Sequence, residues 1–119
     1  MTRKILMPIG DGTEVMDTLY PIFRLQEDGY EVVVAGPEAR HYHGVMHEVP
    51  PHLAIPWDIT REQPAYHVHA TIAFRDVNPQ EYFGVFFSGG RAPEYIRYDE
   101  HLMKITRHFF EAEIGRAHV

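Results

Sequence analysis

Hydrophobic and polar positions change their period along the N-terminal part of the chain, and this predicts a strand, a helix and a second strand. Residues 4–9 form a short apolar run, whereas apolar side chains recur at helical spacing between residues 14 and 28. Pro21 falls inside that helix, so either the helix begins beside the proline or it is kinked there. Residues 30–35 hold three consecutive valines, typical of a strand buried on both faces. The order predicts a right-handed parallel βαβ unit.

The middle of the chain, residues 37–64, is rich in proline and histidine and shows no sustained period. We therefore expect an excursion from the sheet, because long irregular segments of this kind are usually functional or interfacial. Alternation returns at residues 66–74, where apolar side chains hold the even positions from Val68 onward and histidines hold positions 67 and 69. This pattern predicts an edge or antiparallel strand.

Residues 83–97 read as a buried strand, a glycine turn and the start of a helix. In open α/β folds, substrates bind where such turns follow the carboxyl ends of strands. Gly89 and Gly90 leave their N–H groups unobstructed at a helix N-terminus, which suits them to hold an anion or a developing oxyanion. Beyond the turn, apolar residues repeat by four, three and four from Tyr98 to Phe109, which predicts an amphipathic helix over residues 95–112.

Composition limits the classes that fit this pattern. A chain of 119 residues with 45% hydrophobic and 24% charged residues allows one ordinary globular domain. Since no apolar run approaches bilayer length and no signal peptide is recognisable, we expect a cytoplasmic protein with no membrane partner. A net charge of −6 with scattered basic residues argues against nucleic acid as a partner. The absence of cysteine excludes disulfides and thiolate chemistry within this chain.

Two segments carry a specific motif: Ser-Gly-Gly-Arg-Ala-Pro-Glu-Tyr-Ile-Arg at residues 88–97 and Gly-Thr-Glu-Val-Met-Asp-Thr-Leu-Tyr-Pro at residues 12–21. Together they resemble the PfpI family of intracellular cysteine peptidases, which has deglycase, glyoxalase and chaperone relatives in the class I glutamine amidotransferase-like superfamily. The resemblance covers residues 4–112. It implies a doubly wound, flavodoxin-like three-layer α/β sandwich with a mostly parallel sheet, of which residues 1–112 would be the N-terminal two thirds.

The resemblance implies a cysteine hydrolase that acts on a carbonyl of a small-molecule or peptide substrate and forms a homo-oligomer at full length. The alternative is a non-catalytic chaperone or ligand-binding relative, in which the same cleft binds without turnover. A third possibility, an amidotransferase, requires a His-x-Glu sequence downstream of this chain. No cofactor is expected for any of these functions.

Five residues match functional positions of the family. Glu14 matches the glutamate that approaches the thiol in the peptidase branch, and Asp17 matches the alternative acid of the chaperone branch. As an i,i+3 pair they can face one cleft, where like charges favour a protonated carboxyl that donates to a thiolate. Gly89 and Gly90 match the oxyanion turn, with Gly90 supplying the N–H group. Glu94 matches the glutamate that completes a Cys-His-Glu set across a subunit boundary.

Simpler interpretations of the same residues stay open. Glu14, Asp17 and Glu94 are also acids near helix starts, where the helix dipole favours them without any catalytic role. The glycine pair is also what a tight turn with positive φ needs, whether or not it binds an oxyanion.

The last seven residues, 113–119, can be written as GAG ATC GGA AGA GCA CAC GTC, which contains the opening of a widely used sequencing adapter. We expect this segment to be a non-native tail. The competing interpretation is a frayed C-terminus with Gly115 as a helix stop. In the family, the strand and the Cys-His pair of the nucleophile turn follow the helix that ends here at Ala112. We therefore expect this chain alone to be inactive.

Nine histidines raise the question of a metal site. His67 and His69 lie on one strand face, and two histidines at this spacing can bind zinc or copper if an acid joins them. Four more cluster in the irregular middle segment, at His41, His43, His47 and His52. No acid sits at a fixed ligand offset and no His-Glu-x-x-His sequence occurs, so we expect ordinary loop and cleft histidines and no metal.

Overall fold

The structure, a computed structural model, describes residues 2–47, 62–112 and 117–118. In chain order the elements are β1 (Lys4–Pro8), β2 (Thr13–Glu14), α1 (Val15–Glu27), β3 (Glu31–Gly36), β4 (His41–Met46), β5 (Gln63–His69), β6 (Ile72–Ala73), the 3-10 helices η1 (Phe74–Asp76) and η2 (Pro79–Glu81), β7 (Gly84–Phe86), α2 (Ala92–Ile96), α3 (Glu100–Ala112) and β8 (Ala117–His118). Among these residues, none of the helices has the length and hydropathy needed to span a bilayer.

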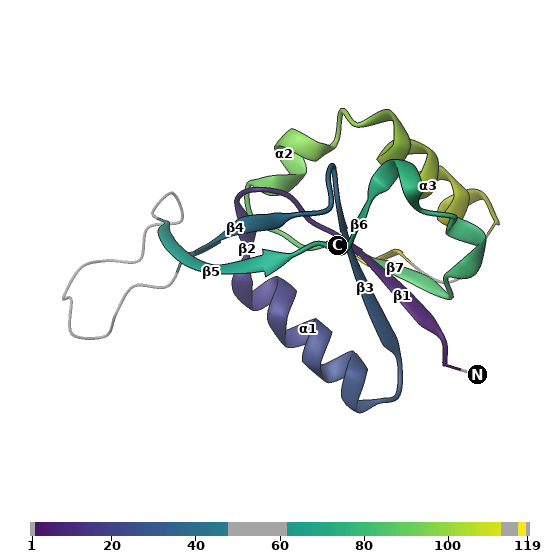
Figure 1. Ribbon diagram of the computed structural model, residues 1–119, viewed down its shortest axis with the longest axis horizontal. Helices are drawn as coiled ribbons and strands as arrows, with labels where there is room; N and C mark the ends of the chain where they lie inside the picture. Colours follow the sequence, from purple (N-terminus) through teal and green to yellow (C-terminus); the bar gives the residue numbers. More distant parts are fainter. Residues whose placement is uncertain (1, 48–61, 113–116, 119) are drawn as a thin grey trace.

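The main sheet has five strands in the order β6-β3-β1-β7-β8, and all of its neighbouring strands run parallel. β1 and β3 pair from Lys4 opposite Glu31 to Pro8 opposite Ala35, and α1 connects them. The predicted βαβ unit is therefore confirmed. Figure 1 shows α1 on one side of the sheet and α2 and α3 on the other. This arrangement confirms the expected flavodoxin-like three-layer α/β class.

Each face of the sheet has its own hydrophobic core, because successive residues of a strand point to opposite faces. On β1, the fully buried Leu6 belongs to the cluster that includes α2 and α3, and the fully buried Met7 belongs to the cluster on the α1 side. The three valines of β3 are buried less completely than predicted. Val34 is buried, but Val32 and Val33 are half-buried.

The prediction of irregular structure over residues 37–64 is wrong for its two ends. β4 and β5 form an antiparallel pair in a second sheet of three strands, in the order β2-β4-β5. The register of β4 shifts between His43 and Val45, and this bulge interrupts the period of two that would have identified a strand. The single strand predicted over residues 66–74 is wrong for its second half. β5 is antiparallel and at the sheet edge, as predicted, with Val68 buried, but it ends at His69, and β6 pairs in parallel with β3 in the main sheet. Residues 48–61 of the segment, including His52, lie outside the described residues.

The single helix predicted over residues 95–112 is two helices, α2 and α3, with Tyr98 exposed between them. The helix is not continuous because the Asp99 carboxylate accepts the N–H groups of His101 at 2.9 Å and Leu102 at 3.0 Å. Such a side-chain cap starts a new helix. The other members of the periodic apolar set are buried as predicted: Leu102, Ile105 and Phe109.

Two further expectations concern Pro21 and the chain's end. α1 runs through Pro21, which excludes the alternative that the helix begins beside this proline.

β8 pairs in parallel with β7, with Ala117 opposite Val85. Two residues of the predicted tail thus lie where the next parallel strand of a doubly wound sheet belongs. Their origin stays a prediction.

Candidate functional site

The loop after β1 and the turn after β7 are joined by backbone hydrogen bonds at the carboxyl edge of the main sheet. Thr13 and Gly90 form an antiparallel bridge. The Glu14 N–H donates to the Gly89 carbonyl at 3.1 Å, and the Arg91 N–H donates to the Gly12 carbonyl at 2.9 Å. The two motifs that carried the family resemblance, far apart in the sequence, therefore meet at one place.

Gly90 is required at this bridge by both conformation and space. Its φ is +93°, in the left-handed region that favours glycine. A Cβ at this position would lie 2.4 Å from the Gly12 carbonyl oxygen and 2.7 Å from the Glu14 nitrogen. The predicted positive φ is confirmed for Gly90 of the glycine pair and not for Gly89. Among the described residues no hydrogen-bond acceptor is assigned to the N–H groups of Gly89 or Gly90.

Asp17 is the acid whose carboxylate lies against the turn. A Cβ on Gly89 would lie 2.5 Å from Asp17 Oδ2, so glycine is needed there for the carboxylate to approach. Glu14 Oε1 instead accepts the Met16 N–H at 2.7 Å and begins α1 as its N-cap. For Glu14 the simpler interpretation as a helix-start acid matches this geometry. Its assignment to a thiol stays a prediction.

Glu94 stands apart from this group. It lies on the short helix α2, its side chain is 71% exposed, and its carboxylate is 3.7 Å from Arg97. The structure thus brings Gly89, Gly90 and Asp17 together with the backbone of Glu14, and leaves Glu94 facing solvent.

Three hydroxyls, which the sequence analysis missed, pack beneath the bridge. Thr13 and Thr18 are fully buried and Ser88 is 4% exposed. Thr13 Oγ1 is 3.1 Å from Thr18 Oγ1 and 2.9 Å from Ser88 Oγ, and Thr18 also contacts Ser88. The Thr18 hydroxyl donates to the Glu14 carbonyl at 2.7 Å. Three hydroxyl protons cannot supply a donor to all four of these contacts at once, so the three hydroxyls form one hydrogen-bond network beneath the bridge.

The signal that could have revealed this cluster was present in the motifs. Thr13 and Thr18 belong to the first motif and Ser88 opens the second. Small hydroxyl residues inside two specific motifs are candidates for a polar contact between them, but neither motif by itself shows the partner.

The turn borders two cavities. One of about 510 Å³ lies between the turn and the helices α2 and α3, and its lining includes Phe87, Ser88, Ile96 and Thr106. Another of about 250 Å³ lies between the turn and α1, and its lining includes Asp17 and Tyr20. Gly89 lines both.

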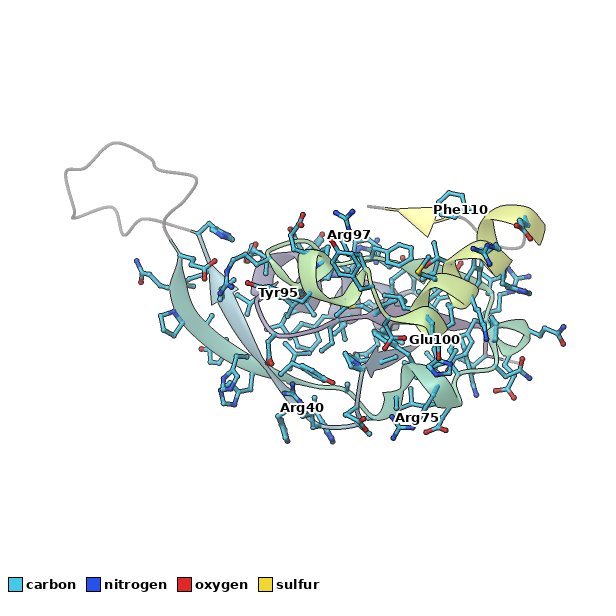
Figure 2. The ribbon with its side chains drawn as sticks, turned by 90° about the horizontal axis from the view of Figure 1, so that it is seen from above. Arg40, Arg75, Tyr95, Arg97, Glu100 and Phe110 are labelled. Carbon is cyan, nitrogen blue, oxygen red and sulfur yellow. The ribbon has the colours of Figure 1, made fainter. Side chains whose placement is uncertain are left out.

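Arg91 connects the turn to Glu62, the residue that precedes β5. Its Nε donates to both carboxylate oxygens of Glu62, at 2.8 and 2.9 Å, and its Nη1 donates to the Tyr95 hydroxyl at 2.5 Å. The Arg91 guanidinium holds the pKa of Glu62 below its usual range and has its own pKa raised in return. His47 Nε2 lies 3.5 Å from Glu62. Figure 2 labels Tyr95, the hydroxyl partner of Arg91 on α2.

The parallel sheet, its two helical layers and the glycine turn at the carboxyl edge define a flavodoxin-like α/β domain with a candidate site at that edge. The chain belongs to the DJ-1/PfpI family, whose model matches residues 3–117. The resemblance stated from the two motifs is therefore confirmed.

Curated relatives of this chain include proteins named as deglycases. Deglycase PfpI from Pyrococcus furiosus is 34% identical over 107 residues, which are 90% of this chain and 54% of that protein. A deglycase from Thermococcus kodakarensis is 32% identical over 108 residues, 91% of this chain and 54% of that protein. The chain thus spans about half the length of these curated relatives.

A solved structure with a similar fold is the two-domain protein from Anabaena variabilis that contains DJ-1/ThiJ/PfpI-like and ferritin-like domains. It superposes with a TM-score of 0.76 at 19% identity and covers 98% of this chain and 29% of that chain. This likeness concerns the fold alone.

Proposed function

We propose that this chain supplies the acid-bearing helix and the oxyanion turn of a PfpI-type cysteine hydrolase of peptidase, deglycase or glyoxalase type, acting on a carbonyl substrate. The observation that carries the proposal is the bridge between Thr13 and Gly90, beside which Asp17 lies against Gly89. The deglycase names of the relatives support a carbonyl substrate.

The chemistry of the turn fits this role. When a thiolate attacks a carbonyl, a C–S bond forms and the carbonyl electron pair moves to oxygen, which needs N–H donors fixed in advance. Gly89 and Gly90 have N–H groups without an assigned acceptor in the described part of the chain, on a turn that backbone bonds hold rigid. In the proposal, Gly90 donates to the oxyanion, and the acid pair at the start of α1 donates a hydrogen bond to the thiolate.

The nucleophile has to come from outside this chain, which contains no cysteine. We place it in the gene after codon 112, on the strand that follows α3. In the assembled protein Glu94 acts across a subunit boundary of a homo-oligomer, and its exposed carboxylate on α2 is compatible with such a contact.

Resequencing the locus from independent DNA tests this proposal first. We expect the gene to diverge after Ala112 into a strand of small and β-branched residues, with Cys-His within roughly a dozen residues, because αβ loops and strands are that short. Confirmation of the present tail followed by a stop codon would remove the hydrolase and leave the non-catalytic binding protein in its place.

Cysteine alkylation in the protein restored in this way tests the acids. Glu14→Gln should shift the pH profile of alkylation by iodoacetamide, Asp17→Asn should shift it less, and Glu81→Gln, an exposed acid on η2, is the matched control. Equal effects of the first two variants, or no effect of either, would assign Glu14 to the helix cap alone.

A further inference from the structure

The outward face of the β4–β5 hairpin carries four histidines in two cross-strand pairs. The register sets His41 opposite His69 and His43 opposite His67, and all four side chains are exposed. Residues two apart on a strand share a face, and directly opposed residues have their Cβ atoms about 5 Å apart. The strand pairing therefore supplies the neighbours that the sequence spacing of His67 and His69 alone did not reveal.

The two pairs differ in geometry. The rings of His43 and His67 are perpendicular, and Nδ1 of His43 lies 3.1 Å from Nε2 of His67. The rings of His41 and His69 are stacked, with centroids 4.4 Å apart and an interplanar angle of 14°. In the stacked pair the ring faces contact each other, whereas in the perpendicular pair two ring nitrogens face each other.

We propose that the His43–His67 pair is a binding site for a borderline transition-metal cation, Cu²⁺, Ni²⁺ or Zn²⁺, on the outward face of the hairpin. Metal–imidazole bonds are about 2.0–2.1 Å long, so two nitrogens 3.1 Å apart subtend an angle of roughly 100° at a shared metal ion. This angle lies between the square-planar and tetrahedral values, both of which these cations accept.

The proton between the two nitrogens does not block the site. In the neutral pair one of them carries the proton as a donor and the other accepts. A shift of that imidazole to its other tautomer leaves both facing nitrogens with a free lone pair, and a turn of each ring by about 40° aims the two lone pairs at one ion. Metal binding then needs no oxidant and no change in the charge of the pair.

The surroundings decide which cations fit. The carboxylate of Asp11, which contacts the His43 backbone, is already engaged, since Oδ1 accepts the His43 backbone N–H at 2.9 Å and Oδ2 pairs with Arg40 at 2.9 Å. Within the described residues no three His, Asp or Glu side chains converge as a metal site. The site is therefore an open one with two imidazole ligands and water, which favours copper over nickel and zinc and disfavours the oxygen-seeking Mg²⁺ and Ca²⁺.

The hairpin adjoins the loop that bridges to the proposed oxyanion turn. The Gly12 N–H donates to the His43 carbonyl at 2.9 Å, and β2 pairs with β4 with Thr13 opposite Gly44. The metal proposal rests on the exposed side chains of the hairpin and does not depend on the proposed reaction.

Binding of Cu²⁺–iminodiacetate, which leaves copper open positions for two imidazoles, tests the proposal in the whole chain at neutral pH. We expect one complex per chain and nitrogen hyperfine lines from two imidazoles in its electron paramagnetic resonance spectrum. His43→Gln and His67→Gln should each weaken binding by about tenfold or more, because the second ligand binds at high effective concentration.

Three controls complete the experiment. His41→Gln should change the affinity by less than about threefold, since its pair is stacked, and His101→Gln on α3 should leave it unchanged. Circular dichroism checks that each variant keeps its fold. When the chain is denatured in guanidinium, the His43→Gln and His67→Gln variants should no longer bind copper more weakly than the other histidine variants. Equal losses from every histidine variant, or unchanged binding without His43 and His67, would overturn the proposal.

Discussion

The glycine turn and the histidine hairpin are both places where distant segments meet, but different parts of the residues make the contact. At the turn the contact is backbone to backbone, between Gly12, Glu14 and the segment around Gly90, above three buried hydroxyls. At the hairpin the chemistry lies in exposed side chains on an ordinary strand pair. The turn should therefore tolerate almost no substitution, whereas the hairpin should accept changes at its histidines with little loss of stability.

Gly90→Ala should have the largest effect. A Cβ there would overlap the Gly12 carbonyl oxygen and force a side chain into positive φ, so we expect a loss of about 3 kcal/mol or more in the free energy of unfolding. Urea denaturation measures it. Gly29→Ala is the matched control, since Gly29 also has positive φ, at +92°, but nothing within 4 Å of the added Cβ. Equal losses for the two variants would show that the close approach at Gly90 contributes nothing.

Thr18→Val should come next, with a loss of about 1–3 kcal/mol, because it removes a buried hydroxyl and leaves its partners Thr13 and Ser88 short of a contact. Thr106→Val serves as control. The Thr106 hydroxyl bonds only to the Leu102 carbonyl of its own helix, so its loss should be smaller. Both are measured by the same denaturation. A loss for Thr18→Val no greater than for Thr106→Val would contradict a structural role for the cluster.

Glu62→Gln should have a smaller, pH-dependent effect. Arg91 lowers the pKa of Glu62 in the folded chain, so the stabilisation is fully present above the unfolded pKa of about 4.3 and is lost as pH falls through the lower folded value. The pair is partly exposed, so we expect less than about 1 kcal/mol at pH 7 and none in strong acid. Denaturation of both proteins across this pH range, with Glu81→Gln as control, measures it. A difference that grows as pH falls would reverse the assigned sign.

His69→Gln should have the smallest effect on stability, about 0.5 kcal/mol or less, because it removes one exposed cross-strand stack with His41. Thermal unfolding without added metal is a sufficient measurement. A loss as large as that of Thr18→Val would mean that the hairpin, like the turn, depends on particular side chains.

The sequence predicted those parts of the fold in which local pattern and tertiary contact agree. β1, α1 and β3 follow from hydrophobic period alone, and the positive φ of Gly90 follows from glycine at a turn. β4 was missed because a bulge after His43 removes the period of two. The break between α2 and α3 was missed because Asp99 caps a helix in the middle of an apolar repeat that continues through it.

The candidate site was predictable as a meeting of two motifs but not as an arrangement of atoms. Gly89, Gly90 and Asp17 come together as their motifs suggested. The sequence does not show which acid faces the turn, because only the coordinates reveal that the Glu14 carboxylate accepts the Met16 N–H and that Asp17 lies against Gly89. The hydroxyl cluster depends on a contact between Thr13 and Ser88, 75 positions apart. Spacing along a sequence carries no information about such a pair.

The bridge also has a consequence for motion. Since the loops after β1 and β7 each donate one backbone hydrogen bond to the other, neither can open without breaking both bonds and exposing the hydroxyls beneath. The amides of Glu14 and Arg91 should therefore exchange with deuterium only through a large, cooperative opening of the domain. A ligand held at Gly90 would rest on a rigid support, and any movement that admits or releases it has to occur elsewhere.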